Sequence, residues 1–186
     1  DWNVSRHSIE IAPIKIYFDG GGLIGVLEVF YRPEKVNQKN ISSIKNEVKD
    51  NQFIDQNALI IGGSRGLGEL VTKIVVAGGG KAIASYFNGK QDIKNLESNI
   101  KKNNLKIKSL KLDINDLTGL KNYLIKEEIS HIYYFASPKI QPNKNKNINK
   151  EMYKKYCYYY VDQYSEILEI LKDINVRKFK VFYPST

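Results

Sequence analysis

A chain of 186 residues can bury one hydrophobic core, and it has no run of about 18 apolar residues, so no membrane span is expected. Its net charge of +9 comes mostly from lysines scattered along the chain, without a basic block that alternates with aromatics. We therefore expect no nucleic-acid partner. The single cysteine, Cys157, excludes an internal disulfide and a cysteine-based zinc cluster. It fits a reducing cytoplasm, and no metal site is expected.

Two β-rich runs flank a glycine turn in the first 34 residues. They occupy residues 13–18 and 23–31, and the turn between them contains three glycines. This pattern predicts a β-hairpin, which is only marginally stable alone and is expected to pack on another domain. Residues 35–56 are polar and rich in Lys and Asn, so they are predicted to be a linker with some helix at 41–49.

Short apolar strands alternate with amphipathic helices from residue 57 to residue 186. Strands are predicted at 57–61, 81–87, 107–112, 131–136 and 178–183. Helices are predicted over 67–75, 91–104, 117–124 and 151–173. Alternation of this kind predicts an α/β fold, namely a doubly wound, Rossmann-like parallel sheet with helices on both faces.

A glycine loop joins the first of these strands to the first helix. Gly62 would let the chain turn sharply off the strand, Gly66 would let the backbone approach a pyrophosphate, and Gly68 would let the helix pack close to the sheet. Amides at the start of a helix attract phosphates. The loop therefore predicts a dinucleotide site, and an ordinary glycine turn is the alternative.

The spacing Gly-x-x-x-Gly-x-Gly, with Ser64 and Arg65 inside it, resembles that of the short-chain dehydrogenase/reductase family over residues 57–186. The resemblance implies a cofactor site made of Gly62, Ser64, Arg65, Gly66, Leu67, Gly68, Asp113, Ile114, Ala136 and Ser137. Two departures stand out. Ile61 replaces the family's usual Thr, so a hydroxyl that braces the loop is missing. Residues 134–137 read Tyr-Phe-Ala-Ser where the family often has Asn-Asn-Ala-Gly, which alters the nicotinamide side.

The end of the second strand bears on the choice of cofactor. An NAD site in this fold has an Asp or Glu about 20 residues past the glycine loop. Here that place reads Ala-Ser-Tyr-Phe-Asn over residues 84–88, and the first acid is Asp92. Arg65 could pair with a 2′-phosphate through two parallel hydrogen bonds, and Lys90 could assist. We therefore expect NADP(H) over NAD(H), with a solvated loop residue as the alternative for Arg65.

The resemblance also implies a catalytic Ser, Tyr and Lys that reduce a carbonyl. Ser185 follows the fifth strand and matches the Ser, with a plain turn residue as the alternative. The Tyr-x-x-x-Lys pair would lie beyond Thr186, so the chain is expected to stop before its catalytic centre is complete. Tyr86 and Lys90 have the right spacing, but they follow the second strand on the adenine side, and we reject them.

These observations predict an NADP(H)-dependent oxidoreductase that interconverts a carbonyl and an alcohol. Residues 14–33 also resemble the last strands of a hot-dog dehydratase, which would make the substrate of a fused ketoreductase an acyl thioester, such as a 3-oxoacyl thioester. The alternative is that the hairpin extends the reductase domain. The first alternative is a non-catalytic NADP(H)-binding sensor or scaffold, and the second, which the net charge would allow, is a basic nucleic-acid-binding domain. A homo-oligomer fits either reading, because short-chain reductases often form dimers or tetramers.

Overall fold

The chain forms two compact units, residues 1–37 and residues 38–186, which we describe separately. The computed structural model describes residues 10–17, 20–31, 38–138, 150–174 and 178–184. Among these residues, no helix is both long and apolar enough to cross a membrane.

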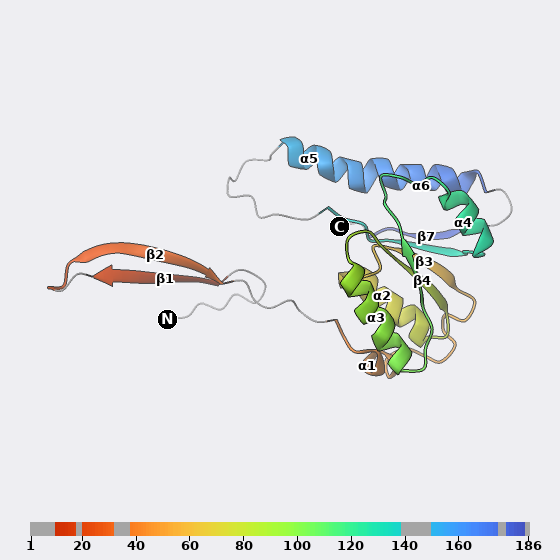
Figure 1. The fold of residues 1–186 in the computed structure, drawn as a ribbon, viewed down its shortest axis with the longest axis horizontal. Helices are drawn as coiled ribbons and strands as arrows, with labels where there is room; N and C mark the ends of the chain where they lie inside the picture. Colours follow the sequence, from red (N-terminus) through yellow and green to blue (C-terminus); the bar gives the residue numbers. More distant parts are fainter. Residues whose placement is uncertain (1–9, 18–19, 32–37, 139–149, 175–177, 185–186) are drawn as a thin grey trace. The chain divides into compact units, whose positions relative to one another are not determined.

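The first unit is the expected hairpin (Figure 1). Strand β1 (Glu10–Tyr17) pairs antiparallel with β2 (Leu23–Tyr31), and the register shifts by one residue between Ile16 and Tyr17. Gly20 and Gly21 in the connection have φ values of 120° and 91°, a region that glycine adopts without strain. The predicted amino-terminal hairpin is confirmed.

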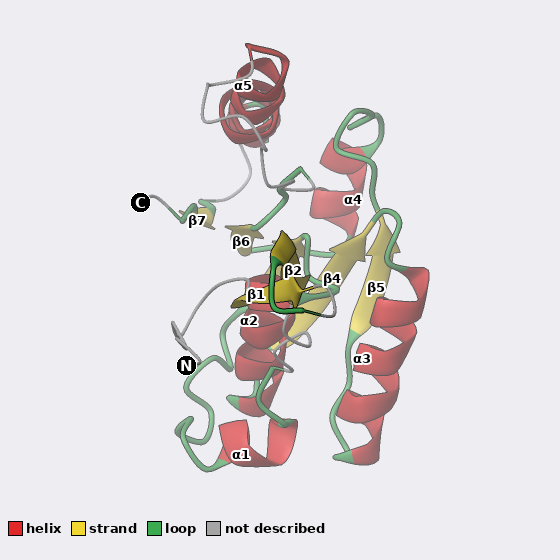
Figure 2. Ribbon diagram, turned by 90° about the vertical axis from the view of Figure 1, so that its left-hand side faces the viewer, coloured by secondary structure: helices red, strands yellow, loops and turns green. Residues whose placement is uncertain are grey.

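The second unit is built on a five-stranded parallel sheet (Figures 1 and 2). Its strands are β3 (Asn57–Ile61), β4 (Lys81–Tyr86), β5 (Lys108–Lys111), β6 (His131–Tyr134) and β7 (Lys180–Phe182). Their spatial order is β5-β4-β3-β6-β7, so the chain first winds to one side of β3 and then to the other. The predicted doubly wound sheet is confirmed, and its topological switch point lies between β3 and β6.

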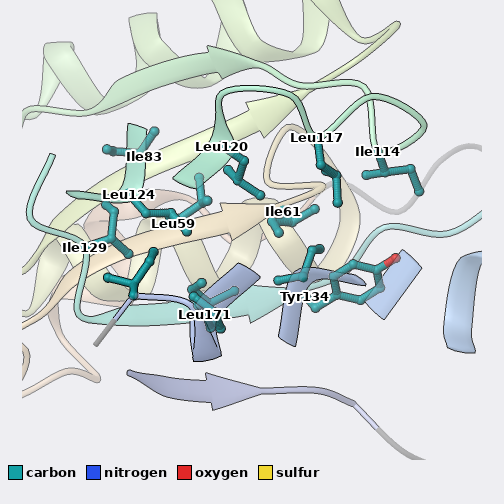
Figure 3. Packing of buried hydrophobic residues seen from close by; sticks show 13 residues of the cluster. Leu59, Ile61, Ile83, Ile114, Leu117, Leu120, Leu124, Ile129, Tyr134 and Leu171 are labelled. Carbon is teal, nitrogen blue, oxygen red and sulfur yellow. The ribbon is translucent and has the colours of Figure 1, made fainter. Parts of the chain in front are cut away.

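Helices cover both faces of this sheet, and each face has its own core (Figure 1). On one face lie α1 (Ile41–Lys45), α2 (Gly66–Ala77) and α3 (Lys90–Lys102). On the other lie α4 (Leu120–Lys126) and α6 (Gln163–Lys172). Figure 3 shows the second core, where alternate residues of the strands meet the two helices; its members include Leu59, Ile61, Ile83, Leu120, Leu124, Tyr134 and Leu171.

The long helix predicted over 151–173 contains a wider turn that the sequence pattern did not indicate. It consists of α5 (Lys150–Cys157), a π-helical turn (Tyr158–Asp162) and α6. Two hydroxyls from the sheet donate to carbonyls of this turn: Tyr134 Oη to Tyr159 O at 2.6 Å and Tyr183 Oη to Tyr160 O at 2.9 Å. Burial raises the pKa of Tyr134, so its hydroxyl keeps the proton that it donates.

The segment expected as a linker, residues 35–56, is described from residue 38 onward and belongs to the second unit. The side chains of Ile41 and Ile44 are buried, and the Lys73 ammonium of α2 donates to Lys39 O at 3.1 Å. Phe53 N–H donates to Gly78 O at 2.8 Å. Two buried isoleucines three positions apart and these hydrogen bonds therefore hold a polar segment against the domain.

Replacement of Leu124 by Ala tests the second core. Leu124 is fully buried, so Leu124→Ala should lower the free energy of unfolding by about 2–5 kcal/mol through lost apolar contacts and the cavity left behind. The neighbouring Ile125 is 40% exposed, and Ile125→Ala should cost much less. Urea unfolding followed by circular dichroism measures both. Equal losses would contradict the assigned packing of α4.

Candidate functional site

A glycine loop leaves the carboxyl end of β3 at the switch point of the sheet and leads directly into α2. Gly62 and Gly66 have φ values of +80° and +60°, which disfavour other residues. A Cβ on Gly68 would lie 2.2 Å from the carbonyl oxygen of Gly62, so only glycine fits there. The loop is therefore folded tightly against the first turn of the helix.

A serine from the neighbouring strand braces this loop. Ser85 Oγ accepts a hydrogen bond from Gly62 N–H at 3.0 Å, and Ser85 O accepts one from Gly63 N–H at 2.9 Å. Ser85 is only 2% exposed, and Thr72 Oγ1 adds a hydrogen bond to Gly68 O at 2.8 Å. The Ser85 hydroxyl on β4 thus bonds the loop, whereas Ile61 at the end of β3 has no hydroxyl with which to do so. In the sequence, Ser85 is distinguished only as a small polar residue in a buried strand.

The start of α2 can receive an anion. Helix α2 begins after Arg65, which makes no side-chain capping hydrogen bond, so the first amides of the helix are not capped by that residue. These amides and the helix dipole favour a negatively charged group. Ser64 is buried in the loop, whereas Arg65 and Leu67 are exposed beside it. The loop offers phosphate-binding geometry with a cation at its rim.

Arg65 faces the start of α3. Its Nη1 lies 4.0 Å from Asp92 Oδ2, and the two side chains are 71% and 37% exposed. The residues that end and follow β4, Tyr86 to Asn88, carry no acid. Lys90 opens α3 and is exposed. The edge of the loop next to β4 is therefore mainly basic, with Asp92 as a nearby counter-charge.

The ends of β4 and β6 flank the glycine loop on its two sides, and the end of β5 lies beyond that of β4. Leu112 N–H donates to Tyr86 O at 2.9 Å, which brings Asp113 beside the end of β4. One Asp113 carboxylate oxygen accepts from Asn115 N–H at 2.9 Å, forming a local turn, and Ile114 is buried. On the other side, Phe135 N–H donates to Ile61 O at 2.8 Å. This bond places the half-buried Ala136 and the exposed Ser137 beside the loop.

The candidate catalytic residue, Ser185, lies outside the described residues. The described chain reaches Pro184, two residues past the end of β7. Tyr86 and Lys90 lie at the end of β4 and the start of α3, and β3 separates β4 from β6. The structure therefore places Tyr86 and Lys90 on the side of the sheet away from β6 and β7, in agreement with the sequence analysis.

Comparisons with known proteins point to one fold. No protein-family model matches the chain, and no curated protein matches it by sequence. Among solved structures, it is similar to the alternative dihydrofolate reductase FolM of Brucella suis in complex with NADP (TM-score 0.56, 13% identity, covering 67% of this chain and 51% of that one). A short chain dehydrogenase from Burkholderia cenocepacia in complex with NADP gives a TM-score of 0.54 at 14% identity, covering 66% and 51%. A putative short chain dehydrogenase from Pseudomonas syringae gives 0.59 at 12% identity, covering 68% and 54%.

These neighbours establish the fold of the second unit. The resemblance to short-chain dehydrogenases and reductases seen in the glycine spacing is confirmed as a similarity of fold. The chain spans about half the length of each of these proteins.

Removal of the Ser85 hydroxyl tests the brace. Ser85→Ala leaves Gly62 N–H without its acceptor, which should lower the free energy of unfolding by about 1–3 kcal/mol. Ser109→Ala is the matched control, because Ser109 is exposed on β5, and its effect should stay within about 0.5 kcal/mol. Urea unfolding compares the two. A Ser85→Ala protein as stable as the control would refute the brace.

Proposed function

We propose that this chain supplies the NADP(H)-binding part of a short-chain oxidoreductase that interconverts a carbonyl and an alcohol. The observation that carries the proposal is the glycine loop, braced by Ser85 and opening α2 at the switch point of the sheet. Ligands of doubly wound folds bind at this point, outside the carboxyl ends of the strands.

The elements around the loop supply residues for each part of such a cofactor. The amides of Gly66, Leu67 and Gly68 would hold the pyrophosphate, since they lie at the start of α2 and the Arg65 side chain does not cap them. Asp113 and Ile114 at the end of β5 would border the adenine. Ala136 and Ser137 after β6 would border the nicotinamide, with Gly62 and Ser64 shaping the loop between them.

The phosphorylated form of the cofactor is favoured by charge. Arg65 is exposed at the rim of the loop, and no carboxylate stands at the end of β4 to accept ribose hydroxyls or repel a 2′-phosphate. The guanidinium can bind a phosphate through two parallel hydrogen bonds. The proteins from Brucella suis and Burkholderia cenocepacia were both crystallised with NADP, which agrees with this choice.

In the reaction, the bound nicotinamide would supply or accept a hydride. Ser185 would polarise the substrate carbonyl, as the family resemblance implies. A small-molecule carbonyl compound is the proposed substrate class, and a 3-oxoacyl thioester is the specific candidate suggested by residues 14–33. A homo-oligomer is proposed by the same resemblance.

A second function, a non-catalytic NADP(H)-binding module, is favoured by one feature. Residues 134–137 bring aromatic side chains to the end of β6, and Phe135 packs against Phe182 with ring centroids 5.9 Å apart. The family pattern has two asparagines there. A site altered in this way would bind the cofactor without catalysing the reaction.

Titration with NADPH and NADH tests cofactor binding and Arg65 together. The chain should bind NADPH more tightly than NADH in isothermal titration calorimetry. Arg65→Gln should weaken NADPH binding about 10-fold or more, because charge-assisted hydrogen bonds are lost, and should leave NADH within about 3-fold. Lys101→Gln, an equal charge change in the last turn of α3, should alter neither.

The outcomes of that titration separate the ideas. No binding of either dinucleotide would refute the proposed function. Binding of both with no loss in Arg65→Gln would keep a dinucleotide site and remove the role of Arg65. An assay of NADPH oxidation with a panel of ketones and 3-oxoacyl thioesters then distinguishes the two proposed functions. Oxidation of NADPH supports the reductase, and tight binding without oxidation supports the non-catalytic module.

A further inference from the structure

The Asp92 carboxylate faces Arg65 at the rim of the glycine loop. Asp92 Oδ2 is 4.0 Å from Arg65 Nη1, and both side chains reach solvent. Asp92 lies in the first turn of α3, where the helix dipole stabilises a negative charge. The Asp92 carboxylate therefore competes with an incoming anion for the Arg65 guanidinium.

The backbone keeps these two groups close to each other. Gly89, just before α3, lies close to the glycine loop. A Cβ there would lie 3.0 Å from Ser64 Oγ and 3.2 Å from Asp92 Oδ2. The turn that carries Asp92 thus lies against the loop that carries Arg65, so the ion pair depends on the fold as well as on the long Arg65 side chain.

We propose that Asp92 is a counter-ion that holds Arg65 in the absence of cofactor and competes with the 2′-phosphate for it, so that Asp92 is displaced when the phosphorylated cofactor binds. This inference rests on the proposed NADP(H) site. The pair is exposed and at the outer limit of ion-pair distance, so it is weak enough to exchange. A 2′-phosphate carries more negative charge than one carboxylate and has three terminal acceptor oxygens, whereas the 2′-hydroxyl of NAD(H) is uncharged and does not compete with Asp92 for the guanidinium.

The consequence is that Asp92 lowers affinity for NADP(H) without touching the pyrophosphate site. Removal of its charge frees Arg65 and also removes a like charge near the phosphate. Both effects strengthen binding of the phosphorylated cofactor, and neither changes the contacts of the unphosphorylated one.

Asp92→Asn tests this inference in the chain as it stands. Calorimetry should show NADPH binding tightened about 1.5- to 5-fold at low salt, the range expected for one exposed ion pair, with NADH unchanged. Adenosine 2′,5′-bisphosphate should repeat the gain and 5′-AMP should not. Glu97→Gln is the matched control, an equal charge change further along α3, and should leave all four affinities unchanged.

The double variant Arg65→Gln/Asp92→Asn separates exchange from repulsion. If Asp92 acts by holding Arg65, most of the gain from Asp92→Asn should vanish when Arg65 is already replaced. A full gain without Arg65 would overturn the counter-ion role. An unchanged NADPH affinity in Asp92→Asn, with NADPH bound by the unaltered chain, would refute this inference alone. Failure of the unaltered chain to bind either dinucleotide would refute it together with the proposed function.

Discussion

The glycine loop can take its path only because Gly68 has no side chain: a Cβ there would meet the carbonyl oxygen of Gly62 at 2.2 Å. This close approach lets α2 start directly over the end of β3. Every other part of the candidate site is arranged around it. Ser85 bonds the loop from β4. On the other side, the chain that follows β6 passes beside the loop.

The sheet order explains why these parts meet. Because β3 is central, its carboxyl end is flanked by β4 and by β6, and the chain crosses to opposite faces on either side of it. Ligands of doubly wound folds bind at this point, outside the carboxyl ends of the strands. The two helix layers and their separate cores hold the strands in register, so the stability of the fold and the geometry of the loop depend on the same packing.

The fold and the loop could be predicted from the sequence, because strand–helix alternation and glycine spacing are local signals. The fastening of residues 38–56 could not, since it depends on Ile41 and Ile44 finding a place beside α2. The brace from Ser85 and the pairing of Arg65 with Asp92 join residues 23 and 27 positions apart, and nothing in the spacing indicates such contacts. The π-helical turn depends in the same way on hydroxyls from Tyr134 and Tyr183.

The central claim, that the glycine loop binds the cofactor, is tested most directly by amide NMR spectra of the ¹⁵N-labelled chain recorded during addition of NADPH. The account predicts that the largest shifts fall on the amides of Gly62 to Gly68, with smaller changes at Asp92 and at Asp113. Saturable shifts confined to the β1–β2 hairpin or to α5, with the loop amides unmoved, would contradict it.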